Sequence, residues 1–427
     1  MPKKNSVVKK SPILKGGVFL ITLSLVFLSM PPLLAETLHV CSSCANTTIR
    51  SAIFAAHNQD TIVVANGVYP EGQLLVDKSL IILGENRPVV DGLNQGHVFL
   101  VKADHVSISG FKIQNSGVSV VEEFAGILAD DVLDCSFIDN VLKNTTYAIY
   151  LAHVEGCRLD ANVMMGNAKD EVNGGNGIHM WYSKKISIRN NHIQNHRDGI
   201  YLEFSDDCVL EGNKSVHNLR YGLHFMYSNR DHYIRNTFEY NQTGVAVMYS
   251  HHIVMDGNHF SHSWGRTSYG LLLKEIDDSQ IVSNMFFGNT VGIYMDGVNR
   301  SQFTENSFRN NGWGVEILGS AADNQFSANN FMSNYFDVAT NSLEIHNTFD
   351  GNYWDSYKGY DLNKDGVGDV PFRPMKVFSL WIGQYPELVA LLESPVIDFL
   401  EMAERIFPVL TPKLLQDNAP RMNVGSL

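Results

Sequence analysis

The chain is 427 residues long, with 44% hydrophobic residues and a formal net charge of −13. Five of its lysines lie within the first 15 residues, so the remainder of the chain is more acidic than the total indicates. An acidic protein repels polyanions, which argues against nucleic acid and against acidic polysaccharide as partners.

Residues 1–35 have the pattern of a secretory signal peptide. The lysines precede an apolar run from Gly16 to Leu28, and the segment ends in Pro31-Pro-Leu-Leu-Ala35, which offers a cleavage position after Ala35. An uncleaved membrane anchor is the alternative. No later segment has 18 consecutive apolar residues, so the mature chain is not expected to span a membrane itself.

The region 36–60 is predicted to form an N-terminal cap. Cys41-Ser-Ser-Cys44 is most simply a local disulfide in an oxidising compartment, with a redox or metal-binding pair as the alternative. Thr47 to Ala56 has apolar residues at helical spacing, and we expect a short amphipathic helix there that covers the open end of the core.

A repeat follows. A motif of Gly and alternating apolar residues recurs in steps of 22, 23, 22, 26, 22 and 22 residues. Its glycines are Gly177, Gly199, Gly222, Gly244, Gly270, Gly292 and Gly314. A column of asparagines has the same rhythm, at Asn191, Asn213, Asn236, Asn258, Asn284 and Asn306. A shared period with two-residue alternation predicts an all-β fold: a right-handed parallel β-helix over 61–350, with strands about 4.8 Å apart.

Three features of the coils lead to further predictions. The asparagines are predicted to form ladders at the bends, where Asn tolerates a left-handed φ and bonds the next coil; a ligand role is the alternative. Cys135, Cys157 and Cys208 share one column and are predicted to be buried free thiols. One coil carries surplus residues at 167–176, a polar loop of the kind that often serves function.

The block 351–375 holds a partial calcium-loop pattern. Asp361, Asn363, Asp365 and Asp369 match its positions 1, 3, 5 and 9, and Gly366 stands at the sharp turn. Position 12 is Phe372 rather than a bidentate Glu. We therefore consider two alternatives. The loop either holds a structural Ca²⁺ ion or is a turn whose Asp side chains only cap backbone groups.

The segment 376–427 is predicted to be an apolar helical tail, with a helix beginning at Ser394-Pro395. A helix this apolar needs a surface to bury against, which is either the β-helix itself or, as we prefer, a groove on a membrane-bound partner. The candidate docking residues are Trp381, Val396, Ile397, Phe399, Leu400, Ile406 and Phe407.

Three segments of the chain resemble the NosD family, periplasmic β-helix accessory proteins of nitrous oxide reductase maturation in denitrification. They are Gly222-Leu-His-Phe-Met-Tyr-Ser228, Gly244-Val-Ala-Val-Met-Tyr-Ser250 and the block from Asn352 to Pro374. The resemblance covers nearly all of the mature chain. It implies a non-catalytic partner of a membrane ABC transporter (ATPase plus permease) that, with a copper-chaperone lipoprotein, helps supply copper to the apo-reductase. It also implies that the tail docks the permease, but it supplies no set of copper ligands.

The strand alternation suggests copper ligands independently. Residues one and three after each Gly are apolar and face the core, whereas residues two and four face outward. This alternation leaves Met180, Met255 and Met295 inside. Outward-facing Met226 and Met248 are predicted to stack on neighbouring coils beside His224, and these are soft and borderline donors that suit Cu(I). We hypothesise an exchangeable Cu(I) site at these three residues with His179 as an outer contact. The alternative is an apolar strip buried under a partner protein.

Two other classes of protein use this fold. A polysaccharide lyase or epimerase needs a basic residue beside acidic groups, and Lys184, Lys185 and Arg189 lie near Asp207 by coil counting. The overall acidity disfavours a uronate substrate. A purely structural surface protein is disfavoured by the predicted exposed His/Met strip.

Overall fold

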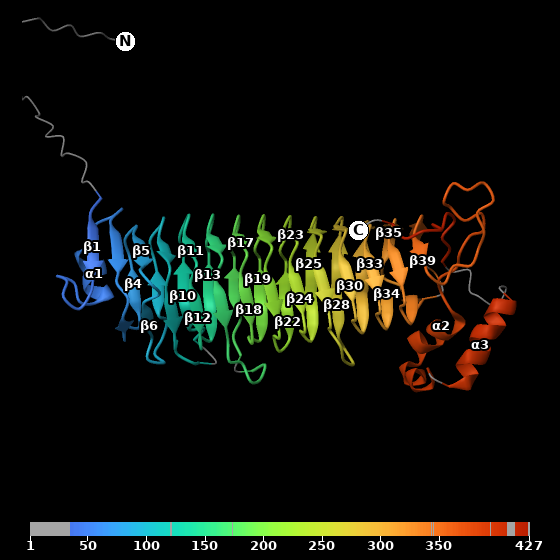
Figure 1. The fold of residues 1–427 in the computed structure, drawn as a ribbon, viewed down its shortest axis with the longest axis horizontal. Helices are drawn as coiled ribbons and strands as arrows, with labels where there is room; N and C mark the ends of the chain where they lie inside the picture. Colours follow the sequence, from blue (N-terminus) through green and yellow to red (C-terminus); the bar gives the residue numbers. More distant parts are fainter. Residues whose placement is uncertain are drawn as a thin grey trace, which may run out of the picture. The chain divides into compact units, whose positions relative to one another are not determined.

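The computed structural model describes residues 35–119, 122–172, 174–342, 344, 346–392, 394–407 and 415–425. The predicted signal peptide lies outside these residues, apart from Ala35. Residues from 35 onward form one unit, in which short parallel strands stack in sequence order along a single axis (Figure 1). The predicted parallel β-helix is confirmed.

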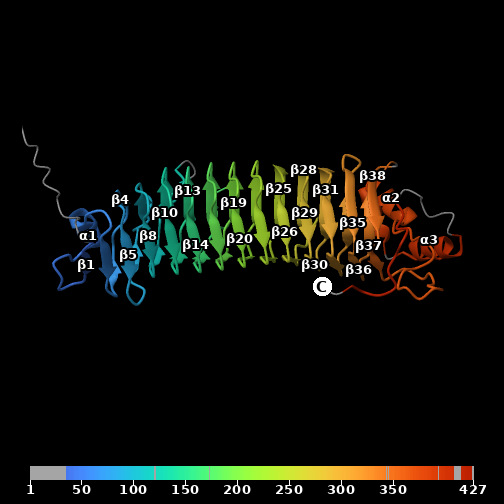
Figure 2. The ribbon, with the colours of Figure 1, turned by 90° about the horizontal axis from the view of Figure 1, so that it is seen from above.

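Two sheets run the length of the stack (Figure 2). The 26-stranded sheet A contains β1 (Thr37–Val40), β2 (Thr61–Val64), β4 (Leu74–Val76), β5 (Ile81–Gly84), β7 (Phe99–Val101), β8 (Ser107–Ser109), β10 (Ala125–Asp130), β11 (Ser136–Ile138), β13 (Tyr147–Ala152), β14 (Arg158–Asp160), β16 (Ile178–Trp181), β17 (Ser187–Arg189), β19 (Asp198–Glu203), β20 (Val209–Glu211), β22 (Tyr221–Met226), β23 (His232–Ile234), β25 (Thr243–His251), β26 (Val254–Asp256), β28 (Tyr269–Asp277), β29 (Gln280–Val282), β31 (Val291–Asn299), β32 (Gln302–Thr304), β34 (Trp313–Ile317), β35 (Ala322–Ser327), β37 (Phe336–Thr340) and β38 (His346–Asp350). The 13-stranded sheet B contains β3 (Val68–Tyr69), β6 (Val89–Asp91), β9 (Lys112–Gln114), β12 (Val141–Lys143), β15 (Val163–Met165), β18 (His192–Gln194), β21 (Lys214–Val216), β24 (Thr237–Glu239), β27 (His259–Ser261), β30 (Met285–Phe287), β33 (Ser307–Arg309), β36 (Asn330–Met332) and β39 (Tyr353–Trp354).

Each coil contributes two strands to sheet A and one to sheet B, and a strand pairs with the strand three places further along the chain. The recurring glycine stands on the first strand of the coil, where successive backbones approach closely. A Cβ atom added at Gly222 would lie 2.6 Å from the carbonyl oxygen of Gly244. The glycine column is therefore required by backbone contact between coils.

The asparagine column forms a buried ladder, as predicted. The backbone N–H and the side-chain amide of Asn236 both donate to Oδ1 of Asn258, at 2.9 and 3.0 Å, and the same pattern recurs along the stack. The expectation that these asparagines are left-handed is wrong. The positive φ belongs to the preceding residue, such as Asn190 (53°) or Arg235 (49°), and the ladder Asn stands between that residue and the first residue of the next strand.

Stacked rings fill the interior beside aliphatic side chains. One stack runs through Phe238, Phe260, Phe286, Phe308, Phe331 and Trp354. Cys208 is a buried free thiol as predicted, but Cys135 and Cys157 form a disulfide that joins adjacent coils, which corrects the prediction for that pair. Their shared column puts the two sulfur atoms within bonding reach. Cys41 and Cys44 form the local disulfide.

The N-terminal end is closed by α1 (Ile49–Ala55), the predicted capping helix, whose N-cap is Thr48 and whose Ile49, Ala52 and Ile53 are buried. At the other end the chain returns after its helices. The backbone of Asp417 forms β-bridges with Phe349 and with Phe372, and the backbone of Arg421 forms one with Tyr353. Residues 415–425 are therefore part of the solenoid rather than of a projecting tail, which differs from the expected division at 376.

Three short helices lie between these segments: α2 (Val377–Gln384), the 3₁₀ helix η1 (Pro386–Leu391) and α3 (Pro395–Ile406). Phe378 and Ile382 pack with Phe336 of the solenoid and Ile397 of α3. The Val377 N–H donates to Glu404 at 2.6 Å, which joins α2 to α3. Among the helices that the structure describes, none is long and apolar enough to cross a membrane.

Candidate functional site

Two rows of side chains line the outer face of the first strands, because alternate residues point into the core. We call them the histidine row and the methionine row. The histidine row runs through Tyr150, His179, Tyr201, His224 and Ala246. The methionine row runs through Trp181, Glu203, Met226, Met248 and Lys274. Neighbours within a row lie on adjacent coils.

Met226 on β22 pairs in register with Met248 on β25. Their backbones are therefore one strand spacing apart, about 4.8 Å, and both side chains lie on the same flank, as the repeat spacing predicts. Both are half-buried rather than fully exposed. Glu203 and Lys274 bound the pair on the coils before and after it. Two thioethers therefore lie side by side within reach of solvent.

His224 is less open than the sequence predicts. Its side chain is only 8% exposed, and its ring lies 5.0 Å from that of Tyr201 and 4.8 Å from that of Tyr221. Within the described part of the chain neither ring nitrogen has a hydrogen-bond partner, and the closest carboxylate contact is 3.9 Å to Asp198. The rings of Tyr201 on the adjacent coil and of Tyr221 on the same strand cover much of the imidazole, which leaves little of it open to a metal ion.

His179 is buried in the same way. Its Nδ1 lies 2.9 Å from the side-chain amide of Asn176, and its ring packs against Tyr150 and Tyr201. Burial, with a smaller effect of Arg197, lowers the pKa of His179 to about 3. The imidazole is therefore neutral, which is the form that binds metals, but it is enclosed.

A depression of about 500 Å³ lies over the histidine row, and a buried ion pair borders it. The Arg220 guanidinium donates to both oxygens of Asp198, at 2.9 and 2.6 Å. Burial alone would raise the pKa of Asp198, but these bonds outweigh it and hold the pKa below its ordinary value. Asp198 is thus an ionised anchor for Arg220.

An exposed aromatic ladder borders the methionine row. The rings of Tyr182, Phe204, Tyr227 and Tyr249 stack at centroid distances of 4.6, 5.1 and 5.0 Å. Each ring residue directly follows a member of the methionine row in the chain, and each is exposed. Sequence reasoning missed this feature, although an aromatic residue five places after Gly in four successive coils is a readable signal.

The residues considered for an enzymatic site are engaged in ion pairs. Lys184 and Lys185 both contact Glu155, at 3.0 and 2.7 Å, and Arg230 holds Asp207 at 2.8 Å. Hydrogen bonding to Glu155 raises the pKa of Lys185, so this lysine is protonated and is a poor general base. The cluster has the character of a solvated surface network.

The side chains of the loop 361–369, which we call the acidic loop, accept hydrogen bonds from the loop's own backbone. Asp361 accepts from the N–H groups of Asp365 and Gly366, at 3.2 and 2.9 Å, and Asp369 accepts from the N–H of Leu362 at 2.7 Å. The side chain of Asn363 donates to Asp365 at 2.9 Å. Phe372, at the place of the bidentate Glu, pairs instead with Asp417. These bonds agree with the capping alternative, and the calcium ion stays a prediction.

The residues proposed for docking divide between two faces of the helical segment. Ile397 is buried, and the partly buried Leu400 packs against the same cluster of Phe336 and α2, so neither lies on the open face of the helical segment. Trp381, Val396, Phe399, Ile406 and Phe407 are exposed, Phe399 to 70%. The structure thus removes two residues from the predicted docking set and leaves five.

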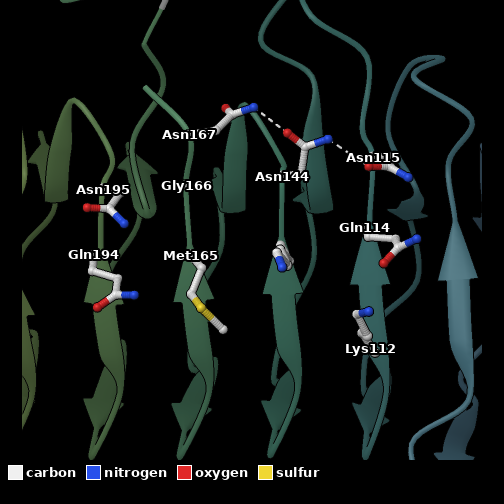
Figure 3. Close-up of a pocket in the computed structure, with 10 residues that line it drawn as sticks. Lys112, Gln114, Asn115, Asn144, Met165, Gly166, Asn167, Gln194 and Asn195 are labelled. Carbon is white, nitrogen blue, oxygen red and sulfur yellow. Dashed lines mark hydrogen bonds between the residues drawn. The ribbon is translucent and has the colours of Figure 1, made fainter. Parts of the chain in front are cut away.

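A polar groove of about 420 Å³ crosses sheet B away from both rows (Figure 3). Asn144 donates to Asn115 at 2.7 Å, and Asn167 donates to Asn144, so the amides form a chain along the rim. None of the candidate site residues lines this groove. In the described part of the chain, no three His, Cys, Asp or Glu side chains are arranged to hold a metal ion.

Comparison with known proteins identifies the family. The family model described as periplasmic copper-binding protein (NosD) matches residues 169–359. A protein of Pseudomonas aeruginosa named probable ABC transporter binding protein NosD is 30% identical over 374 residues, which cover 83% of this chain and 86% of that protein. The chain belongs to the NosD family. A protein of the same name from Stutzerimonas stutzeri is 28% identical and covers 83% of this chain and 85% of its own length.

The part matched to the NosD model contains both methionines and the aromatic ladder, but it ends before the acidic loop and the helices. Among solved structures, the surface adhesin PfbA of Streptococcus pneumoniae aligns with a TM-score of 0.51 and 12% identity. The alignment covers 74% of this chain and 91% of the adhesin, and it shows the fold alone.

Proposed function

We propose that this NosD-family protein is a periplasmic accessory protein that works with a membrane ABC transporter, composed of an ATPase and a permease, in assembling the copper site of nitrous oxide reductase. It receives Cu(I) from a copper-chaperone lipoprotein or presents it to the apo-reductase. Family membership supports this proposal, because the family is described as periplasmic and copper-binding and the relatives are named ABC transporter binding proteins.

The observation that carries the proposal is the pairing of Met226 with Met248. Thioether sulfur is a soft donor that favours Cu(I) over the harder divalent ions. The two side chains come from paired positions on adjacent coils and are half-buried, so their thioethers can meet one ion from the same flank. Two donors leave the coordination of Cu(I) incomplete, and a third donor from a delivering or receiving protein can complete it. Such a site favours transfer over storage.

The surroundings of the methionines suit a transient complex between two proteins. The ladder from Tyr182 to Tyr249 gives a flat apolar border next to the ion, and aromatic side chains are enriched where proteins meet. His224 and His179 lie in the neighbouring row of the same face and are largely covered by tyrosine rings. They contribute as outer contacts, since the rings of Tyr201 and Tyr221 cover much of the His224 imidazole.

A Cu(I) titration against a competing chelator tests the proposal. We expect Met226→Leu with Met248→Leu to lower the Cu(I) affinity at least about tenfold, because leucine keeps the apolar shape and removes both sulfur atoms. Met165→Leu is the matched control, because Met165 is a half-buried methionine on sheet B whose neighbours on adjacent coils are Lys143 and Gln194. Unchanged affinity in the double variant would show that the copper is not held there.

The same variants separate copper binding from simple docking. If the strip serves only as an apolar contact, the leucine pair should retain binding to the partner protein and the alanine pair Met226→Ala with Met248→Ala should weaken it. If the strip carries Cu(I), both pairs should lose copper.

A further inference from the structure

A second and larger cleft, of about 1100 Å³, lies toward the C-terminal end of the same sheet face. Its floor is the continuation of the histidine row through Tyr294, Glu316 and Ala339. The turn 262–268, which carries Trp264, forms one wall, and α2 and η1 form the other. The hydroxyl of Tyr335 donates to the carbonyl of Leu392 at 2.6 Å, which holds the end of η1 against the solenoid.

Glu316 is the unusual group in this cleft. It lies on β34 between Tyr294 and Ala339 of the adjacent coils. Among the residues that the structure describes, none forms a hydrogen bond or an ion pair with its carboxylate. Burial raises its pKa to about 7. The Glu316 side chain is half-buried in the cleft. A partly desolvated carboxylate without an ion-pair partner among the described residues is characteristic of sites that complete their charge balance with a ligand.

The rings around Glu316 are suited to a cation. Tyr269 and Tyr294 lie 4.9 Å apart, and Trp313 precedes Glu316 on the same strand. The faces of such rings carry negative electrostatic potential and attract ammonium groups. The protein uses this attraction at the rim of the cleft, where Nζ of Lys376 lies 5.8 Å from the ring centre of Phe336.

From this arrangement we propose that the cleft binds a small organic ammonium compound, with Glu316 as its counter-ion and Tyr269, Tyr294 and Trp313 as its aromatic walls. A metal ion fits poorly, because the floor offers a single carboxylate among rings. An anion fits poorly as well, because the carboxylate of Glu316 on the floor would repel it. The two walls and the volume suit a small molecule, and the acidic chain attracts cations.

This site is separate from the proposed copper site. Four coil spacings, roughly 19 Å, separate His224 from Glu316 along the histidine row. The methionine variants should therefore leave the cleft unchanged, and variants in the cleft should leave Cu(I) affinity unchanged.

Isothermal titration of the full mature protein with choline chloride tests the proposal. Its neutral isostere 3,3-dimethylbutan-1-ol and sodium chloride of equal ionic strength are the controls. We expect choline to bind, the neutral alcohol to bind at least about tenfold more weakly, and Glu316→Gln to lose about tenfold in choline affinity. Glu203→Gln, a carboxylate on the methionine row, should have no effect.

A second variant protects the test against a misfolded protein. Tyr294→Leu keeps an apolar side chain on the floor of the cleft and should weaken choline binding severalfold while the circular dichroism spectrum is unchanged. Equal binding of choline and its neutral isostere, or undiminished binding by Glu316→Gln, would overturn the proposal. Binding of lysine-containing peptides without binding of the free ammonium compound would also overturn it, because the occupant would then be a protein.

Discussion

At the scale of single residues, Glu316 couples a ligand site to the stability of the fold. Burial raises its pKa from 4.5 to about 7. The folded chain therefore holds this proton more tightly than the unfolded chain does. A raised pKa of an acid gives stability that is fully present at low pH and is lost as the pH rises from about 4.5 through 7. Above that interval the ionised carboxylate lowers the free energy of unfolding, and a bound cation would offset this loss.

We expect Glu316→Gln to remove this pH dependence, because the amide has the same shape and does not ionise. In the absence of ligand, the thermal unfolding midpoint of the variant should be close to that of the wild type at pH 5. At pH 8 it should be higher, by an amount equivalent to roughly 3 kcal/mol at most. Thermal unfolding followed by circular dichroism at both pH values checks this. A difference in unfolding midpoint between the variant and the wild type that is the same at both pH values would contradict the raised pKa of Glu316.

At the scale of elements, the asparagine ladder needs an end, and Asp417 provides it. The carboxylate accepts the N–H groups of Gly351 and Asn352 at 3.1 and 2.9 Å, the Asn352 side-chain amide at 3.1 Å and the Trp354 indole at 3.0 Å. Asp417 is fully buried. It thus occupies the place that the Asn of one further coil would take, and it gives the last ladder donors an acceptor.

Asp417→Ala should loosen the last coils. The substitution leaves several buried donors unpaired, at about 1–3 kcal/mol for each group. Because a solenoid is stabilised by nearest-neighbour contacts, we expect the loss to stay local. Hydrogen exchange should accelerate in β36 and β39 and remain unchanged in β10 and β13. Asp350→Ala, at an exposed position on β38, is the control. Uniform acceleration along the chain would argue against a terminal cap.

Column spacing explains how far these elements could be predicted. It states which residues are neighbours along the axis, and so it predicts the coils, the ladder and the contact of Met226 with Met248. It does not state how neighbouring rings cover a side chain, which is why His224 was expected to be open. Nor does it separate two adjacent thiols from a disulfide, as at Cys135 and Cys157. Asp417 carries no periodic signal, because it returns to the stack from beyond the helices.

At the scale of the whole unit, the stack is closed differently at its two ends (Figure 1). The helix α1 covers the N-terminal end, whereas α2 and α3 lie at the C-terminal end, where Asp417 also forms a β-bridge with β38. On α3, Ile397 is buried in the cluster with Phe378 and Ile382 of α2, whereas Val396, Phe399 and Ile406, at spacings of three and seven, are exposed. A contiguous apolar helix face at one end of a rigid post is suited to insertion into a groove of a membrane-bound permease.

Truncation at Lys376 is a poor test of this docking, because it also removes Asp417 and opens the last coil. We propose Phe399→Asp with Ile406→Asp in the full chain, which places two charges on the exposed face and leaves the cap intact. Capture of the detergent-solubilised permease by the mature protein should fall by about thirtyfold, since buried aromatic anchors dominate interface energies. The thermal unfolding midpoint should be unchanged, because both side chains are exposed. Phe54→Asp, on the exposed face of α1 at the opposite end, should capture the permease as the wild type does. Undiminished capture by the double variant would place the contact elsewhere, and loss in the Phe54 variant would shift it to the N-terminal cap.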